Sequence, residues 1–407
     1  MLFLDRHSLG DVCCGHSQSC LHLCAFASLR EIFPPGAWYP EPCPLALDVL
    51  ETAFFQKMNP IALLFLLLAV LFTAPRTQAD PIRPKVIILT TFEIGADTGD
   101  RPGELQYWVE REKLTHTLDV PGLLHPLRFN DSGVYAMLTG TCNRSGLAMM
   151  LLGSDPRVDL SQTYFIMAGI AGVDPNRASV GSAAWAQWVV DGDNVNEIDG
   201  HDAPKEWPYG ILPYGATSPD QPPGPHDWSQ KPMAFQLDPG LVSWAFNLSK
   251  DVSLSDTPEL GKYRASYVGY PNAQRPPFVL IGDTLGSARY WHGAALTQWA
   301  ENWCKLYTDS KANFVMTECE DQSIAYALYM LGRAHRADPR RYLVLRTASN
   351  YCEPPPGVTV LDSLLHGEAS GELLAVESAY RVGAPVVHEL VQHWDRYATE
   401  LPKPDVH

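Results

Sequence analysis

The stretch TYFIMAGIAGVDP, residues 163–175, decides the fold of this chain. Its first half is almost continuously apolar and shows no alternation with polar residues, which is typical of a strand buried on both faces. Glycines at positions 169 and 172 and an Asp-Pro pair follow. We therefore expect a buried strand over 163–170 that leads into a glycine-rich turn over 168–175.

Similar short apolar runs lie on both sides of this stretch and alternate with helical patterns. In 288–308, for example, Trp291, Ala295, Trp299 and Trp303 recur every four residues, as on one face of a helix. This alternation predicts an α/β fold: a three-layer αβα sandwich with a mixed, mostly parallel sheet covered on both faces. Further strands are expected over 84–91, 133–140, 278–284, 313–318 and 341–349, an extended strand or hairpin over 186–200, and helices over 143–155, 288–308, 320–335 and 370–398.

Residues 203–239 interrupt this rhythm with nine prolines and several aromatic side chains. Segments of this length without regular structure are usually functional or disordered. The tryptophans at 207 and 228 argue against simple disorder. An ordered excursion or lid over a site and a plain surface insertion both fit this composition.

The chain before residue 80 has the pattern of a secretory signal. Ile61 to Phe72 form an apolar run of 12 residues, too short for a bilayer core. Lys57 precedes the run, and Thr77-Gln78-Ala79 supplies small residues for cleavage. A buried core helix is the alternative. We expect a signal peptide over 58–79, a non-native or poorly ordered leader over 1–57, one domain over 80–407, and a secreted or cell-surface location.

Charge and cysteine content limit the possible partners. The net charge of −16 argues against binding to nucleic acid or to anionic membranes. No apolar run near 18 residues follows residue 79, so no integral membrane span is expected there. Five cysteines before residue 58 lack the spacing of a zinc module, and no metal site is predicted. Three N-x-S sequons, at Asn130, Asn143 and Asn247, fit a secreted glycoprotein.

Four cysteines remain after residue 79, at positions 142, 304, 319 and 352. In an oxidising compartment they could form two disulfides, with three possible pairings. They could equally be small buried side chains.

Several short motifs end predicted strands and would meet at one edge of the sheet. They are LTGTCNRSGLA (138–148), IGDT (281–284), MTECEDQSIAYAL (316–328) and LRTASN (345–350), beside the glycines of 168–175. Ligands of open parallel sheets bind beyond the carboxyl ends of the strands. We therefore expect a pocket where Gly140, Gly169, Asp283, Asp321 and Asn350 come together.

This series of motifs resembles the nucleoside phosphorylase and nucleosidase superfamily. Within it, the stretches TTFEIGAD (90–97), GIAGVDP (169–175) and DGDNVNEIDGHDAP (191–204) are most similar to the purine nucleoside permease family. The resemblance spans about residues 84–400. It implies a sandwich of the nucleoside phosphorylase type and a pocket for a purine nucleoside.

The resemblance also implies roles for individual residues. Glu320 or Asp321 would hold the ribose hydroxyls, with Asp321 nearer the family's motif and one methylene shorter than its glutamate. Asn350 would hydrogen-bond the purine, and Glu93 matches a water-activating acid. Ordinary alternatives exist for each: a first-turn acid of a helix, a turn asparagine and a helix-start carboxylate.

The same resemblance leaves the attacking group open. Gly140 and Thr141 with Arg144 could hold phosphate through backbone N–H groups, a hydroxyl and a guanidinium. Glu93 would favour water instead. No cofactor is expected, and phosphate is a possible co-substrate. Further substrate contacts are implied at Gly169, Gly172, Asp283 and Glu320.

Three functions share this pocket. The first is a purine nucleoside permease-family protein that binds purine nucleosides and takes part in their uptake and metabolism. The second is a secreted purine nucleoside phosphorylase or nucleosidase that cleaves the N-glycosidic bond. The third is a binding module that delivers nucleoside to a membrane channel. A homo-oligomer or a channel partner is compatible with all three.

Overall fold

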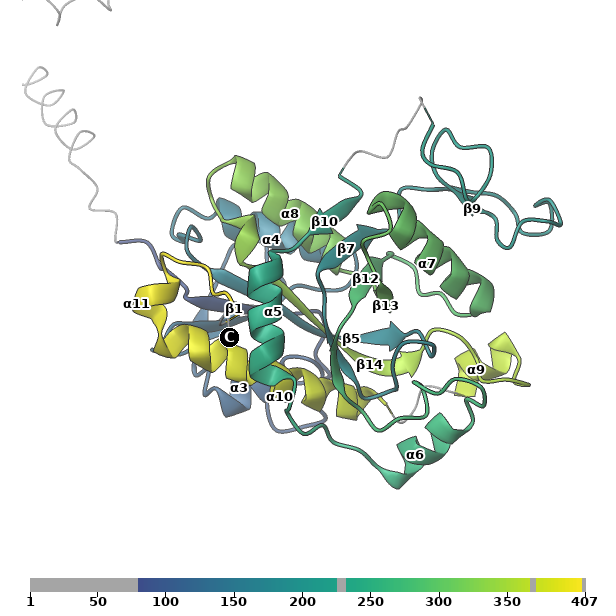
Figure 1. Ribbon diagram of the computed structural model, residues 1–407. Helices are drawn as coiled ribbons and strands as arrows, with labels where there is room; N and C mark the ends of the chain where they lie inside the picture. Colours follow the sequence, from purple (N-terminus) through teal and green to yellow (C-terminus); the bar gives the residue numbers. More distant parts are fainter. Residues whose placement is uncertain (1–79, 225–231, 367–370, 405–407) are drawn as a thin grey trace, which may run out of the picture. The chain divides into compact units, whose positions relative to one another are not determined.

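A computed structural model describes residues 80–224, 232–366 and 371–404 (Figure 1). The predicted leader and signal segment, residues 1–79, lie outside the described residues. No helix in those three described ranges combines the length and apolar character needed to cross a bilayer.

A mixed sheet of 12 strands forms the centre of the described chain. Strand β1 (Val86–Thr90) pairs in parallel with β4 (Val134–Leu138) and with β5 (Tyr164–Val173), and β5 pairs in parallel with β14 (Tyr342–Tyr351). Every residue of β1 and β4 is buried, as expected for strands covered on both faces.

Antiparallel partners extend this parallel centre. Strand β13 (Phe314–Glu318) runs antiparallel to the end of β5 and parallel to β12 (Asp283–Gly286). The remaining strands of the sheet are β2 (His116–Leu118), β3 (Leu127–Phe129), β6 (Ala183–Trp185), β7 (Trp188–Asp191), β10 (Ala234–Gln236) and β11 (Val279–Ile281).

Neighbouring side chains of β14 show how helices cover both faces of the sheet. Leu345 packs toward α10 (Glu372–Gln392), whereas Arg346 points to the start of α8 (Asp321–Arg333). Successive side chains of a strand point to opposite faces, so these two helices lie on opposite sides. The predicted three-layer αβα arrangement with a mixed sheet is confirmed (Figure 1).

The other helices complete these layers and the outer segments. Helix α4 packs on α8, while α3 and α5 pack on α10. Their bounds are α3 (Gln106–Arg111), α4 (Arg144–Ser154), α5 (Pro239–Ser249), α6 (Pro258–Ala265), α7 (Ala294–Tyr307), α9 (Val360–His366) and α11 (Trp394–Tyr397), with a short 3-10 turn at Pro339–Arg341.

The glycine-rich segment after residue 168 is a strand and not the predicted turn. Strand β5 continues to Val173 because β14 and β13 both pair with its last residues. A Cβ atom at Gly169 would lie 2.7 Å from Arg346 Nη1, and one at Gly172 would lie 2.8 Å from Thr317 Cγ2. The glycines therefore allow side chains of neighbouring strands to approach the backbone of β5.

Two other predicted strands differ in detail. The strand expected over 278–284 is broken at Gly282, where β11 ends and β12 begins. A side chain at Gly282 would collide with Val315, at 2.4 Å from its Cγ2. The stretch 186–200 contributes β7 to the large sheet, and its end, β8 (Asn196–Glu197), pairs with the distant β9 (Ile211–Leu212) instead of folding back on β7.

The described part of the proline-rich excursion packs against α7. Tyr209, Ile211 and Met233 are buried in one apolar cluster with Trp299 and Trp303. The Nδ2 atom of Asn302 donates a hydrogen bond to the Tyr209 hydroxyl at 3.1 Å. The segment is thus an ordered excursion where it is described, and its role as a lid stays a prediction.

Candidate functional site

A cavity of about 270 Å³ opens where β1, β5, β13 and β14 end. Its volume is close to the lower limit of small-molecule pockets, which begin near ~300 Å³. Its lining residues are Thr91, Phe92, Glu104, Thr141, Ile170, Ala171, Gly172, Arg289, Tyr290, Trp291, Thr317, Glu318, Cys319, Glu320, Arg346, Ser349, Asn350 and Glu372.

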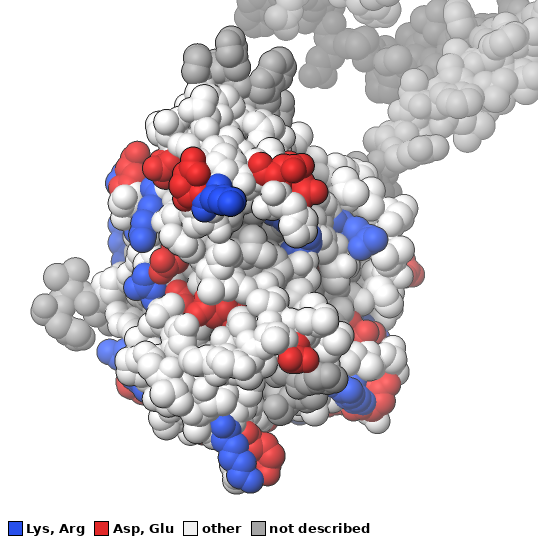
Figure 2. Space-filling model, turned by 90° about the vertical axis from the view of Figure 1, so that its right-hand side faces the viewer, with Lys and Arg blue, Asp and Glu red and all other residues white. Residues whose placement is uncertain are grey.

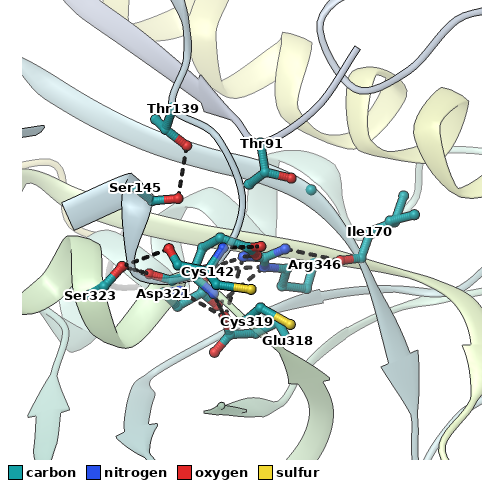
Figure 3. Close-up of polar contacts among 12 residues, drawn as sticks. Thr91, Thr139, Cys142, Ser145, Ile170, Glu318, Cys319, Asp321, Ser323 and Arg346 are labelled. Atoms are coloured by element: carbon teal, nitrogen blue, oxygen red, sulfur yellow. Dashed lines mark hydrogen bonds and ion pairs between the residues drawn. The ribbon is translucent and has the colours of Figure 1, made fainter. Parts of the chain in front are cut away.

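A buried guanidinium organises the floor of this cavity. The side chain of Arg346 is 1% exposed, and its Nη2 atom lies 2.6 Å from Asp321 Oδ1 and 2.9 Å from Glu320 Oε2. Its Nη1 atom donates to the Ile170 carbonyl at 2.9 Å. Figure 3 shows this arginine among the residues of the β13–α8 turn. Arg346 was not among the residues predicted from the sequence.

The side chain of Glu318 caps the turn between β13 and α8. The Oε2 atom of Glu318 accepts hydrogen bonds from the N–H groups of Glu320 at 2.5 Å and Asp321 at 2.7 Å. It thereby satisfies the free N–H groups at the start of α8. Burial raises the pKa of Glu318 well above its usual value, with the nearby Asp321 charge adding to the effect. This cap leaves the side chains of Glu320 and Asp321 free to meet Arg346.

Glu320 and Asp321 point to different places. Glu320 lines the cavity, and its Oε1 atom accepts a hydrogen bond from the Cys142 N–H at 3.1 Å. Asp321 is fully buried below the cavity, with both carboxylate oxygens on Arg346. Of the two alternatives for the ribose contact, only Glu320 faces the cavity. Asp321, the nearer match to the family motif, is committed to the ion pair.

Glu104 is a second buried acid at the cavity. Its Oε2 atom accepts from the Thr91 N–H at 2.7 Å and hydroxyl at 2.8 Å, and its Oε1 atom accepts from the Ile170 N–H at 2.8 Å. Burial raises the pKa of Glu104 to about 7, although Arg346 opposes the shift. A carboxyl group with a pKa near neutrality is suited to general acid–base work. Sequence reasoning missed it.

Glu93 lies elsewhere, which corrects its predicted placement. Its Oε1 atom accepts hydrogen bonds from Ile94 and Gly103 N–H groups, and its Oε2 atom accepts from Leu105 at 2.9 Å and Gln106 at 2.7 Å. The carboxylate therefore caps the start of α3 and does not line the cavity. Its position is that of the alternative interpretation, a carboxylate at the start of a helix.

Asn350 lies at the cavity as predicted. Its Nδ2 atom donates to the Tyr290 hydroxyl at 3.2 Å, and its Oδ1 atom accepts from the Ser349 hydroxyl at 2.8 Å. Gly172 also lines the cavity, where a Cβ atom would lie 3.3 Å from Asn350 Nδ2. Gly169 lies just below, with its Cα facing Arg346 and Glu104.

The segment proposed for phosphate is only partly at the cavity. Thr141 lines it, and Gly140 makes the turn with a φ of 80°. Arg144 is exposed, lies outside the lining, and its Nη1 atom is 3.3 Å from the Thr141 hydroxyl. The structure thus brings the turn, but not its guanidinium, to the cavity.

Asp283 lies at the opposite end of its strand, so its predicted place in the pocket is wrong. It begins β12 and pairs in register with Phe314, the first residue of β13, whereas the cavity lies beyond the last residue of β13. Its carboxylate accepts from the N–H groups of Gln187 and Trp188, both at 2.8 Å, and Asn313 at 2.6 Å. Asp283 therefore ties three segments together.

Carboxyl groups outnumber guanidinium groups in the cavity lining, and burial raises the pKa of two of them, Glu104 and Glu318. The lining includes the carboxyl groups of Glu104, Glu318, Glu320 and Glu372 but only two guanidinium groups. Arg346 pairs with the floor carboxylates, and Arg289 pairs with Glu197. Figure 2 shows acidic and basic side chains next to one another along the upper part of one face of the molecule. Both guanidinium groups of the lining are therefore already paired with carboxylates.

Comparisons with known proteins agree on one family. A model of the purine nucleoside permease (NUP) family matches residues 83–402. A protein of Schizosaccharomyces pombe described as a "probable purine nucleoside permease" is 28% identical over 324 residues, covering 77% of this chain and 90% of the relative. The purine nucleoside permease of Candida albicans is 26% identical and covers 77% of this chain and 76% of the relative.

Some similarity to solved structures was also found. A 5′-methylthioadenosine/S-adenosylhomocysteine nucleosidase of Neisseria meningitidis covers 75% of this chain and 99% of its own, with 13% identity and a TM-score of 0.44. A futalosine hydrolase of Helicobacter pylori covers 75% and 98%, with 12% identity and a TM-score of 0.45. The family match spans far more than half of the chain and confirms the resemblance seen in the sequence. This chain belongs to the purine nucleoside permease family.

Proposed function

We propose that the cavity binds a purine nucleoside and that the chain takes part in nucleoside uptake, as the names of its relatives suggest. The observation that carries this proposal is the Glu320 carboxylate, which is held in the cavity wall by the Cys142 N–H and the Arg346 guanidinium. A fixed carboxylate can accept hydrogen bonds from both vicinal hydroxyls of a ribose. Its position is set before any ligand arrives.

Other residues of the cavity suit the base. Both N–H groups of the Asn350 side chain already donate, to the Tyr290 hydroxyl and the Tyr351 carbonyl, but its Oδ1 atom keeps a lone pair that can accept from a purine N–H. Phe92 and Tyr290 line the same cavity and supply aromatic surface against which a flat base can pack. The distribution of polar and aromatic groups therefore matches the two halves of a nucleoside.

A second candidate function, cleavage of the N-glycosidic bond by water, is favoured by Glu104. With a pKa of about 7, its carboxylate can take a proton from a water molecule that attacks C1′ of the ribose. The bond from C1′ to the purine nitrogen breaks, the base leaves with the electron pair, and solvent returns a proton to it. Glu320 would stabilise the positive charge that develops on the ribose.

The charge of the cavity favours water over phosphate as the attacking group. Both arginines of the lining already pair with carboxylates, so neither guanidinium is free to hold phosphate. Arg144, the guanidinium expected to hold phosphate, lies outside the lining. Water carries no charge and needs no guanidinium to hold it.

Binding is tested by calorimetric titration with inosine and adenosine. Two charge-assisted hydrogen bonds to the ribose, each worth about 1.5–3 kcal/mol, predict that Glu320→Ala weakens binding by about a hundredfold or more. Glu259→Ala, at an exposed carboxylate in the first turn of α6, is the matched control and should leave affinity unchanged. Equal affinity in both variants would contradict the assignment of this cavity.

Cleavage is tested by incubating the protein with each nucleoside, with and without phosphate, and measuring free base. Hydrolysis predicts base and free ribose without phosphate. It also predicts that Glu104→Gln stops their release while nucleoside still binds. Base released only with phosphate would instead indicate phosphorolysis. No base in either condition would leave binding as the sole function of the site.

A further inference from the structure

Two thiols and a carboxylate that are distant in the sequence meet beside the cavity. The Sγ atoms of Cys142 and Cys319 and a carboxylate oxygen of Glu320 all lie within 4.8 Å of one another. Cys142 belongs to the turn between β4 and α4, and Cys319 to the turn between β13 and α8. Figure 3 shows the two sulfur atoms side by side. Among the residues that the structure describes, this is the only such group of three metal-binding side chains.

We propose that Cys142, Cys319 and Glu320 form a binding site for a thiophilic divalent cation such as Zn²⁺ or Cd²⁺. Thiolates select these ions over Mg²⁺ or Ca²⁺, which prefer oxygen ligands. Bond lengths of about 2.3 Å to sulfur and 2.0 Å to oxygen place the ligand atoms of a tetrahedral zinc about 3.5–3.8 Å apart. The distances between the three ligand atoms therefore need to shorten by only about 1 Å for the ion to bind.

The position of the group leaves room for a fourth ligand. Cys319 and Glu320 both line the cavity, so one side of the ion would face the cavity. Zinc sites with three protein ligands normally complete their tetrahedron with water at such an open position. On binding, the two S–H protons pass to solvent, and the two thiolates and the ion form the metal–sulfur bonds.

The electrostatic surroundings favour a cation at this position. Carboxylate oxygens of Glu318, Glu320 and Asp321 lie within 3.5 Å of a single guanidinium, that of Arg346. A divalent ion held by the two thiols would add positive charge beside these carboxyl groups.

The local contacts of Cys142 can be exchanged for a metal bond. Its thiol contacts the Ala288 carbonyl at 3.5 Å, a weak interaction that binding would replace. Its backbone has a φ of 57°, a left-handed conformation that is uncommon for residues other than glycine. This conformation holds the thiol and the N–H of the same residue beside Glu320.

The cation site overlaps the nucleoside site at Glu320. If Glu320 holds the ribose, as proposed above, cation and nucleoside compete for one carboxylate, and saturating Zn²⁺ weakens nucleoside binding. This consequence rests on the proposed function, whereas the cation site does not. Metal binding is therefore measured first without nucleoside, so that failure of one proposal is distinct from failure of the other.

The experiment is a Cd²⁺ titration of the full chain, reduced and kept in a non-coordinating phosphine reductant. Thiolate-to-cadmium absorption in the ultraviolet reports sulfur ligation directly, and Zn²⁺ is then added in competition. The same titration is run on C142S/C319S. The other seven of the nine cysteines are common to both proteins, so the difference between the two curves isolates this site.

The wild-type protein should bind one Cd²⁺ more than C142S/C319S. The single variants C142S and C319S and the variant Glu320→Gln should lower the affinity of that ion by at least about 10–100-fold, the loss seen when only an outer-shell partner of a metal ligand is changed. Cys304→Ala and Cys352→Ala, at the two buried cysteines, should leave it unchanged. Thermal unfolding of each variant checks that it is folded.

Two results would overturn the proposal. One is a wild-type titration curve that matches that of a folded C142S/C319S. The other is a Cys142–Cys319 disulfide, detected by peptide mass spectrometry, that persists in the reductant. That result would assign the pair to a cross-link and select one of the three pairings that the sequence leaves open.

Discussion

Replacing Arg346 with methionine tests whether one guanidinium balances the buried carboxyl groups at the floor of the cavity. Its Nη2 atom lies 2.6, 2.9 and 3.5 Å from carboxylate oxygens of Asp321, Glu320 and Glu318. Methionine keeps much of the side-chain bulk but leaves these groups without their cation. Removing one partner of a buried ion pair usually costs about 3–5 kcal/mol.

Protonation sets an upper limit on this cost. The cluster can lose one negative charge by taking up a proton, and a glutamate has an ordinary pKa near 4.5. At pH 7.5 such a protonation costs about 4 kcal/mol, at ~1.4 kcal/mol per pH unit. We therefore expect Arg346→Met to lower the free energy of unfolding by about 3–4 kcal/mol at pH 7.5, and by only about 1–2 kcal/mol at pH 5.5.

Urea denaturation at the two pH values measures this difference. The matched control is Arg340→Met. The side chain of Arg340 is exposed, so its ion pair with Asp338 should contribute less than about 1 kcal/mol to stability. A second substitution, Asp321→Asn, should restore part of the stability of Arg346→Met because it removes one unbalanced charge. A loss equal to that of Arg340→Met, or one that does not change with pH, would refute this account of the cluster.

Three further predictions concern single positions. The pKa of Glu104 is raised to about 7 in the folded protein, which therefore holds a proton that the unfolded chain releases from about pH 4.5 upward. Stability should accordingly fall as pH rises from 4.5 to 7, and thermal unfolding should show a smaller fall for Glu104→Gln than for the wild type. Gly169→Ala would place a Cβ atom 2.7 Å from Arg346 Nη1 and 2.8 Å from Glu104 Oε1, so it should lower both stability and nucleoside affinity in calorimetry; unchanged affinity would show that the cluster tolerates displacement. Asp283→Ala leaves three backbone N–H groups without their acceptor and should cost about 2–4 kcal/mol in urea denaturation while nucleoside affinity stays within twofold; a large loss of affinity in a folded variant would return Asp283 to the site.

The layered fold could be predicted because its signal is local. Strands such as β1 and β4 are continuous apolar runs, and the tryptophans of α7 recur at helical spacing. The glycines of β5 were misjudged because a glycine in a strand and a glycine in a turn look alike in one sequence. Only the neighbours, Arg346 and Thr317, explain why these positions lack side chains.

Residues of the candidate site could be predicted only where they lie in a motif at the end of a predicted strand. Glu320 follows β13, Asn350 is the next-to-last residue of β14, and both line the cavity. Glu93 and Glu104 are both acids after β1, and nothing in the local pattern says which one is used as a helix cap. The placement of Asp283 in the pocket was wrong because the predicted strand is broken at Gly282. The aspartate therefore begins β12 instead of ending a strand. The sequence could not identify Arg346 as a site residue. Its role depends on ion pairs with residues 25 or more positions away, which the local pattern does not reveal.

The place of β14 has a consequence for how the chain is made. Residues 342–351 pair with β5 along its whole length, yet they are synthesised about 170 residues later. While a ribosome works through the intervening segment, the edge of β5 lacks its permanent neighbour and presents free backbone N–H and C=O groups. Partly made chains of this kind are prone to aggregate. A nascent chain released before residue 342 should therefore depend on chaperones, and it would lack Arg346 and Asn350, so the site would be completed only when nearly all of the protein exists.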